Sequence, residues 1–101
     1  MHILITGMKG QLGQELARTL GDHHVTGADL PEVDITDRQT VFRAVEEVSA
    51  ELVIHCAAYT DVEGCARDPQ LAYRVNGLGT QNVALACLHQ GAEMVHISTN
   101  E

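Results

Sequence analysis

The stretch HILITGMKGQLGQEL, from His2 to Leu16, decides the fold of this chain. It opens with the β-rich run His2–Thr6 and continues with glycines at positions 7, 10 and 13. A dinucleotide-binding turn needs small residues there, because one permits the tight turn, one lets backbone amides approach a pyrophosphate and one lets the helix pack closely on the strand. The amides and dipole of the following helix then face the anion. The stretch predicts a phosphate-binding loop, with a purely structural turn as the alternative.

Beyond this loop, short apolar runs alternate with helix-forming segments. The patterning predicts strands at 2–6, 23–29, 52–58 and 93–99, and helices at 11–20, 37–48 and 69–90. Asp37 is suited to cap its helix, and Pro69 to the first turn of the next. Because a helix separates successive strands, the strands must run parallel, and right-handed crossovers make an α/β, three-layer, doubly wound sheet of Rossmann type. We expect one dinucleotide-binding domain over residues 1–101, with about four strands of an incomplete fold.

Composition and charge argue against several classes of protein. The net charge of −8 disfavours a nucleic-acid surface, and no run approaches the ~20 apolar residues of a membrane span. The amino terminus shows no signal peptide, and three cysteines without a CxxC pair indicate reduced, inert thiols in a cytoplasmic protein. No metal site is expected, because His23 and His24 are adjacent and would point to opposite faces of a strand.

Asp29 ends the second predicted strand, 22 positions after Gly7. A carboxylate at about that spacing accepts hydrogen bonds from the adenosine ribose of a dinucleotide. It would also repel a 2′-phosphate, which favours NAD mildly over NADP, although Lys9 in the loop partly offsets that repulsion. The alternative is that Asp29 is a solvated loop acid.

Two longer stretches carry a resemblance to a known family. They are GQLGQEL (Gly10–Leu16) and AAYTDVEGCARDPQLAYRVNGLGTQNVA (Ala57–Ala84). With the GxxGxxG spacing after Thr6, they resemble the dTDP-4-dehydrorhamnose reductases, in the extended branch of the short-chain dehydrogenase/reductase superfamily. The resemblance implies an NAD(P)-dependent oxidoreductase that transfers hydride to the 4-keto group of dTDP-4-dehydrorhamnose, giving dTDP-rhamnose.

The resemblance also implies roles for individual residues. It places Thr99 at the catalytic hydroxyl that hydrogen-bonds the substrate carbonyl, with the substrate itself facing Thr60 and Val62. The implied cofactor contacts fall on Gly7, Met8, Gly10, Gln11 and Leu12 in the loop, Asp34 and Ile35 beside the adenine, and Ala57, Ala58 and Tyr59 beneath the ribose and nicotinamide. For Ala57 and Ala58, ordinary core packing is the alternative.

The chain lacks the Tyr-x-x-x-Lys pair that reduction in this superfamily requires. Its tyrosines, Tyr59 and Tyr73, are followed four positions later by Glu63 and Gly77, and Lys9 is its one lysine. We therefore expect a fragment that is inactive alone, cut from a longer enzyme.

Other functions remain open on the sequence. One is a non-catalytic dinucleotide-binding or regulatory module of the same fold, and another is a nucleotide-sugar dehydratase or epimerase relative. Asn100 disfavours a dehydratase, because it replaces the acid that donates the proton. A folded fragment without activity is a third. Among partners we expect a nucleotide-sugar substrate, no nucleic acid and no membrane, with a homodimer left open.

Overall fold

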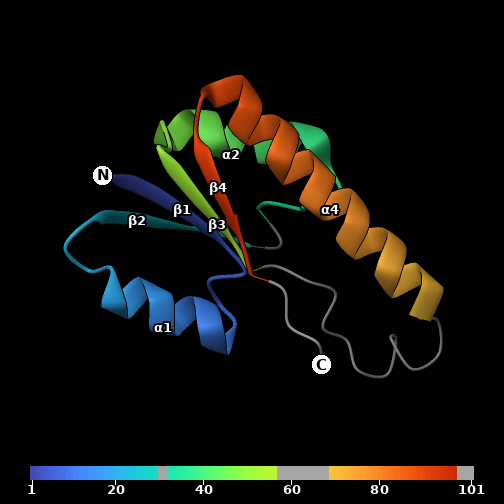
Figure 1. Ribbon diagram of the computed structural model, residues 1–101, viewed down its shortest axis with the longest axis horizontal. Helices are drawn as coiled ribbons and strands as arrows, with labels where there is room; N and C mark the ends of the chain where they lie inside the picture. The colour runs from blue at the N-terminus through green and yellow to red at the C-terminus, as the bar shows by residue number, and fades with distance from the viewer. Residues whose placement is uncertain (30–31, 57–68, 98–101) are drawn as a thin grey trace.

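The structure, a computed structural model, describes residues 1–29, 32–56 and 69–97. Strands and helices alternate along them as the sequence predicts (Figure 1). Their bounds are β1 (His2–Thr6), α1 (Gln11–Thr19), β2 (His24–Ala28), α2 (Arg38–Val48), β3 (Leu52–His55), α4 (Pro69–Gln90) and β4 (Glu93–His96).

The four strands form one parallel sheet in the order β2-β1-β3-β4. The chain therefore crosses from β2 on one side of β1 to β3 on the other, which confirms the doubly wound arrangement. The register sets the carboxyl ends level: Thr6 pairs with Ala28 and with His55, and His55 pairs with His96. Residues that leave these strands consequently emerge at one edge of the sheet.

Helices cover both faces of the sheet, so the fold has three layers (Figure 1). Ile3, Ile5 and Ile54 point to one face, where α1 packs through Leu16, Ala17 and Leu20. Leu4 and Val53 point to the other face, toward α2 and α4. A strand buried on both faces reads as a continuous apolar run, which explains ILI at the centre of β1. Burying one Ile or Val side chain completely stabilises the folded state by about 1.5–3 kcal/mol.

Local signals place the helix ends. The Asp37 carboxylate accepts a hydrogen bond from the Gln39 N–H at 3.1 Å and caps α2, as predicted. The helix α1 ends at Thr19, with Leu20 as its C-cap and Gly21 directly after it. The strands are shorter than predicted: β3 ends at His55 and β4 at His96.

The helix α4 is the longest that the structure describes, and it packs on α2 and the sheet. Its buried side chains include Val83, Ala86 and Cys87, which join the core beneath α2. Among the described helices, none combines the length and the apolar character needed to cross a membrane.

Candidate functional site

The glycine loop closes a tight turn between β1 and α1. Gly7 has φ +73°, a left-handed conformation in which a side chain would be strained. Its N–H donates to the Ala28 carbonyl at 3.2 Å, and the Gly10 N–H donates back to the Gly7 carbonyl at 3.0 Å. Gly10 is the N-cap of α1 and makes no side-chain capping hydrogen bond. The first amides of α1 are therefore not covered by the cap residue, which suits an anion.

Gly13 allows the first turn of α1 to lie directly on the loop. A Cβ at this position would overlap the Gly7 carbonyl oxygen and lie 2.6 Å from the Met8 Cα. Gly10 is less constrained, since its Cβ would lie 3.3 Å from the same oxygen. The close approach that the spacing predicts is thus enforced at Gly13 by backbone atoms, which cannot move aside as a flexible side chain can.

The other residues of the loop divide between core and surface. The Met8 side chain packs toward β2, where a Cβ at Gly27 would lie 2.6 Å from its Cε. Gln11 and Leu12 are exposed at the start of α1. Gln14, which sequence reasoning did not single out, donates from Nε2 to the Lys9 carbonyl at 2.9 Å and braces the loop.

The carboxylate of Asp29 lies against the glycine loop. Its Oδ2 accepts a hydrogen bond from the Lys9 backbone N–H at 3.2 Å. The end of β2 and the loop after β1 are thereby joined, and a carboxylate is held next to the glycine loop. Asp29 is half-buried, so it is more constrained than a freely solvated loop acid.

The segment containing Asp34 and Ile35 is held by its own hydrogen bonds. The Asp34 Oδ1 accepts from the Thr36 N–H at 2.9 Å and from the Thr36 hydroxyl at 2.6 Å. The Ile35 side chain packs on α4, where a Cβ at Gly79 would lie 2.7 Å from its Cγ1. The Ile35 carbonyl accepts a hydrogen bond from the Asn82 Nδ2 at 2.9 Å. Both residues therefore have structural contacts that the sequence did not indicate.

His55 is a feature of this edge that sequence reasoning missed. It is fully buried, with Nδ1 2.6 Å from the Thr6 Oγ1 and Nε2 3.2 Å from the Thr80 Oγ1. Burial, and to a smaller extent the charge of neighbouring His96, lower its pKa to about 4 from an ordinary value of 6.5. The available signal was one imidazole inside the apolar run LVIHCAA, because a buried polar group needs partners.

Several predicted site residues lie outside the described residues. These are the ribose and nicotinamide contacts Ala57, Ala58 and Tyr59, the substrate contacts Thr60 and Val62, and the catalytic Thr99. Within ranges 1–29, 32–56 and 69–97, no three side chains of His, Cys, Asp or Glu are grouped as a metal site would need.

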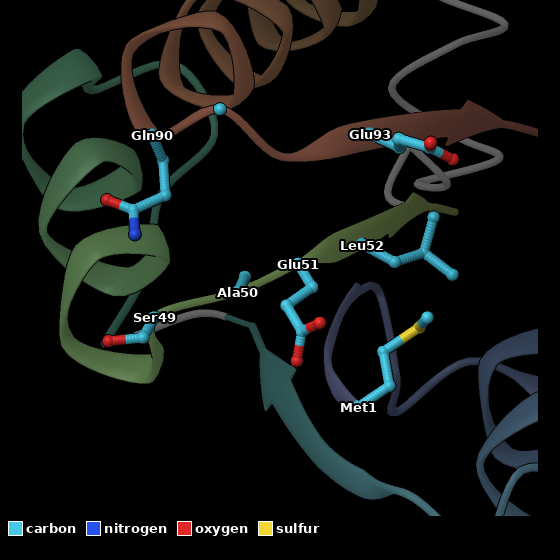
Figure 2. Close-up of a pocket in the computed structure, with 8 residues that line it drawn as sticks. Met1, Ser49, Ala50, Glu51, Leu52, Gln90 and Glu93 are labelled. Atoms are coloured by element: carbon cyan, nitrogen blue, oxygen red, sulfur yellow. The ribbon is translucent and has the colours of Figure 1, made fainter.

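A hollow lies at the opposite edge of the sheet, around the amino ends of β1, β3 and β4 (Figure 2). Met1, Glu51 and Glu93 line it together with the ends of α2 and α4. Ligands of doubly wound sheets bind at the carboxyl ends of the strands, and two carboxylates would repel a phosphate. We therefore assign the site to the edge that carries the glycine loop.

Comparison with known proteins agrees with this geometry. Residues 1–101 match the family model described as RmlD substrate binding domain. A dTDP-4-dehydrorhamnose reductase from Aggregatibacter actinomycetemcomitans is 37% identical over 98% of this chain and 35% of its own length. The chain thus spans about a third of the length of such relatives.

Solved structures give the same result. The structure of dTDP-4-dehydrorhamnose reductase from Bacillus anthracis in complex with NADP is 39% identical, with a TM-score of 0.85 over 95% of this chain and 35% of that one. The UDP-glucose 4-epimerase of Thermus thermophilus in complex with NAD is 30% identical, with a TM-score of 0.82 over 93% of this chain and 36% of that one. The chain belongs to the RmlD substrate binding domain family.

Proposed function

We propose that the chain is the amino-terminal NAD(P)-binding part of a nucleotide-sugar reductase. The observation that supports the proposal is the hydrogen bond from the Lys9 N–H to Asp29, which holds a carboxylate beside the start of α1. The glycine loop also fits a dinucleotide-binding turn, because α1 lies so close to the loop that a Cβ at Gly13 would overlap the Gly7 carbonyl oxygen. A reduced nicotinamide cofactor, when bound, would supply the hydride.

The chain's own residues would hold the cofactor along this edge. Gly7, Met8, Gly10, Gln11 and Leu12 would contact the cofactor, with the amides of Gln11 and Leu12 at the start of α1 facing the pyrophosphate. Asp29 would bind the adenosine ribose. The segment of Asp34 and Ile35 would border the adenine. Ala57, Ala58 and Tyr59 would lie beneath the ribose and nicotinamide, with Thr60 and Val62 on the substrate side.

The proposed reaction is reduction of the 4-keto group of dTDP-4-dehydrorhamnose to give dTDP-rhamnose. Thr99 would donate a hydrogen bond to the substrate carbonyl oxygen as negative charge develops on it. Reduction would also need a Tyr-x-x-x-Lys pair, which these 101 residues do not supply, because neither Tyr59 nor Tyr73 has a lysine four positions later. The related reductases with the same amino-terminal portion support this assignment.

Calorimetric titration of NADH and NADPH into the purified chain tests cofactor binding. We expect both to bind, and Gly13→Ala to weaken binding by about tenfold or more, because the added methyl displaces the loop. Gly77→Ala is the matched control, since a Cβ there meets nothing within 4 Å. Absence of binding to the unaltered chain would refute the proposal, and equal binding by Gly13→Ala would refute the role of the loop.

The same titration addresses the choice between NAD and NADP. We propose a preference for NAD, supported by the negative charge of Asp29 at the end of β2. Replacing Asp29 by Asn removes the negative charge and should reduce the difference between the affinities of the chain for NADH and for NADPH. Tighter binding of NADPH than of NADH, both by the unaltered chain and by Asp29→Asn, would contradict the proposed preference for NAD.

The proposed reductase activity would be tested on a longer protein that carries this chain together with a Tyr-x-x-x-Lys pair. We expect that protein to oxidise NADH or NADPH in the presence of dTDP-4-dehydrorhamnose, as followed by the absorbance of the reduced nicotinamide. Binding of cofactor without oxidation would instead favour a non-catalytic module of the same fold.

A further inference from the structure

His55 lies where three elements of the candidate site meet. It is the last residue of β3, is fully buried, and extends to the face covered by α2 and α4, like Val53 two positions earlier. Its Nδ1 is 2.6 Å from the hydroxyl of Thr6 on β1, and its Nε2 is 3.2 Å from that of Thr80 on α4. A hydroxyl can donate or accept, so both hydrogen bonds form with a neutral imidazole.

We propose that His55 is a positioning residue for the dinucleotide: it ties the carboxyl ends of β1 and β3 to α4 and so fixes the glycine loop in its binding geometry. This inference rests on the proposed cofactor-binding function. His55 is fully buried on the face of the sheet covered by α2 and α4, so it acts through Thr6 and Thr80 rather than by touching the cofactor.

The first link runs from His55 to the glycine loop. Thr6 directly precedes Gly7, and its hydroxyl also accepts the Cys56 N–H at 3.1 Å. The Cys56 N–H lies 3.0 Å from the Thr6 carbonyl oxygen as well. One buried hydroxyl therefore joins the start of the loop to the point where the chain leaves β3. Loss of the imidazole would remove the 2.6 Å hydrogen bond to this buried hydroxyl, which weakens the junction.

The second link runs through α4 to the segment proposed to border the adenine. Thr80 follows Gly79, the position against which the Ile35 side chain packs. One turn of α4 consequently receives both the imidazole from β3 and the isoleucine from the segment after β2. Through this shared turn of α4, His55 thus fixes the position of the glycine loop relative to the Ile35 segment.

The test compares His55→Leu with Val53→Ala by calorimetric titration of NADH and by thermal unfolding. Both changes remove buried atoms from β3 on the same face, and Val53 has no part in the hydrogen bonds to Thr6 or Thr80. We expect both variants to unfold at lower temperature. Only His55→Leu should bind NADH about tenfold or more weakly, because it loses two hydrogen bonds that position the loop.

His55→Asn provides the rescue, since its amide can reach Thr6 in place of Nδ1. We expect it to recover most of the NADH affinity. If His55→Leu does not fold, Thr80→Val, which removes the hydroxyl partner of Nε2, is the test variant, and we expect it to bind NADH more weakly. Unchanged affinity in His55→Leu, or equal weakening in Val53→Ala, would overturn the positioning role while the proposed function stands. If the unaltered chain does not bind NADH, the proposed function and this inference both fail.

Discussion

Single buried polar residues define how the site edge is held. His55 finds hydroxyl partners on both ring nitrogens, whereas Asn82 donates to the Ile35 carbonyl and its buried Oδ1 has no partner among the described residues. Burying such a group unpaired costs about 1–3 kcal/mol. Asn82 therefore sacrifices some stability for a hydrogen bond that fixes the segment proposed to border the adenine, whereas His55 fixes its neighbours with both nitrogens paired.

The pKa of His55 predicts how stability depends on pH. In the unfolded chain the imidazole takes up a proton near its ordinary pKa of 6.5, but in the folded chain the pKa is lowered to about 4 by burial and by His96. Between these values the unfolded state binds more protons, so the free energy of unfolding falls as the pH is lowered from 6.5 toward 4. The expected loss is roughly 3 kcal/mol.

Urea unfolding at a series of pH values checks this expectation. His55→Asn is the control, because it cannot titrate, and its stability should fall less steeply over the upper part of that interval, where carboxylates remain charged. If the free energy of unfolding depended on pH in the same way for both proteins, the fold would not be keeping the imidazole neutral.

At the scale of elements, α4 organises the site although it contributes no part of the glycine loop. It packs on α2, receives the Ile35 side chain at Gly79 and meets β3 through Thr80. Glycine is a weak helix former, so its presence at position 79 needs a steric reason. The reason is the Ile35 side chain, which occupies the space where a Cβ would lie.

Alanine at positions 77 and 79 of α4 should have opposite effects. Gly77→Ala meets no atom within 4 Å and should stabilise the chain by up to about 1 kcal/mol through helix propensity. Gly79→Ala would drive a methyl into Ile35 and should destabilise by about 1–3 kcal/mol. Thermal unfolding of the two variants measures the difference, and a stabilised Gly79→Ala would show that Ile35 does not pack there.

On the scale of the whole molecule, the two faces of the sheet are unequally covered. α1 packs beneath β1 and lies away from β4, as Figure 1 shows. Within the described residues β4 pairs only with β3, and Val95, on the face of Ile54, is 46% exposed. An exposed edge strand with an apolar side chain is a template for pairing with another chain.

We therefore expect the isolated chain to self-associate through β4. Val95→Lys should weaken the association by about tenfold, because it places a charge on the exposed strand and removes an apolar contact. Leu88→Lys is the control, since Leu88 is 79% exposed on α4, away from the strand. Sedimentation over a range of concentrations measures both, and equal effects of the two variants would place the contact elsewhere.

The sequence by itself determined the order of the elements and the glycine loop. These depend on signals that act within a few residues: the apolar run ahead of Gly7, the Asp37 cap and helical periodicity. The Asp29 contact was also foreseeable, because parallel strands bring their carboxyl ends together. The cofactor, substrate and catalytic roles of individual residues remain predictions, including those of Ala57, Ala58, Tyr59, Thr60, Val62 and Thr99.

Only the tertiary structure decided how that loop is held. His55 lies 49 positions from Thr6 and 25 from Thr80, and Asn82 lies 47 positions from Ile35. Such partners are chosen by the register of the sheet and by the packing of α4 on it, and no local pattern specifies either. The sequence indicates that a histidine in an apolar strand needs hydrogen-bond partners, but only the tertiary structure determines which hydroxyls these are.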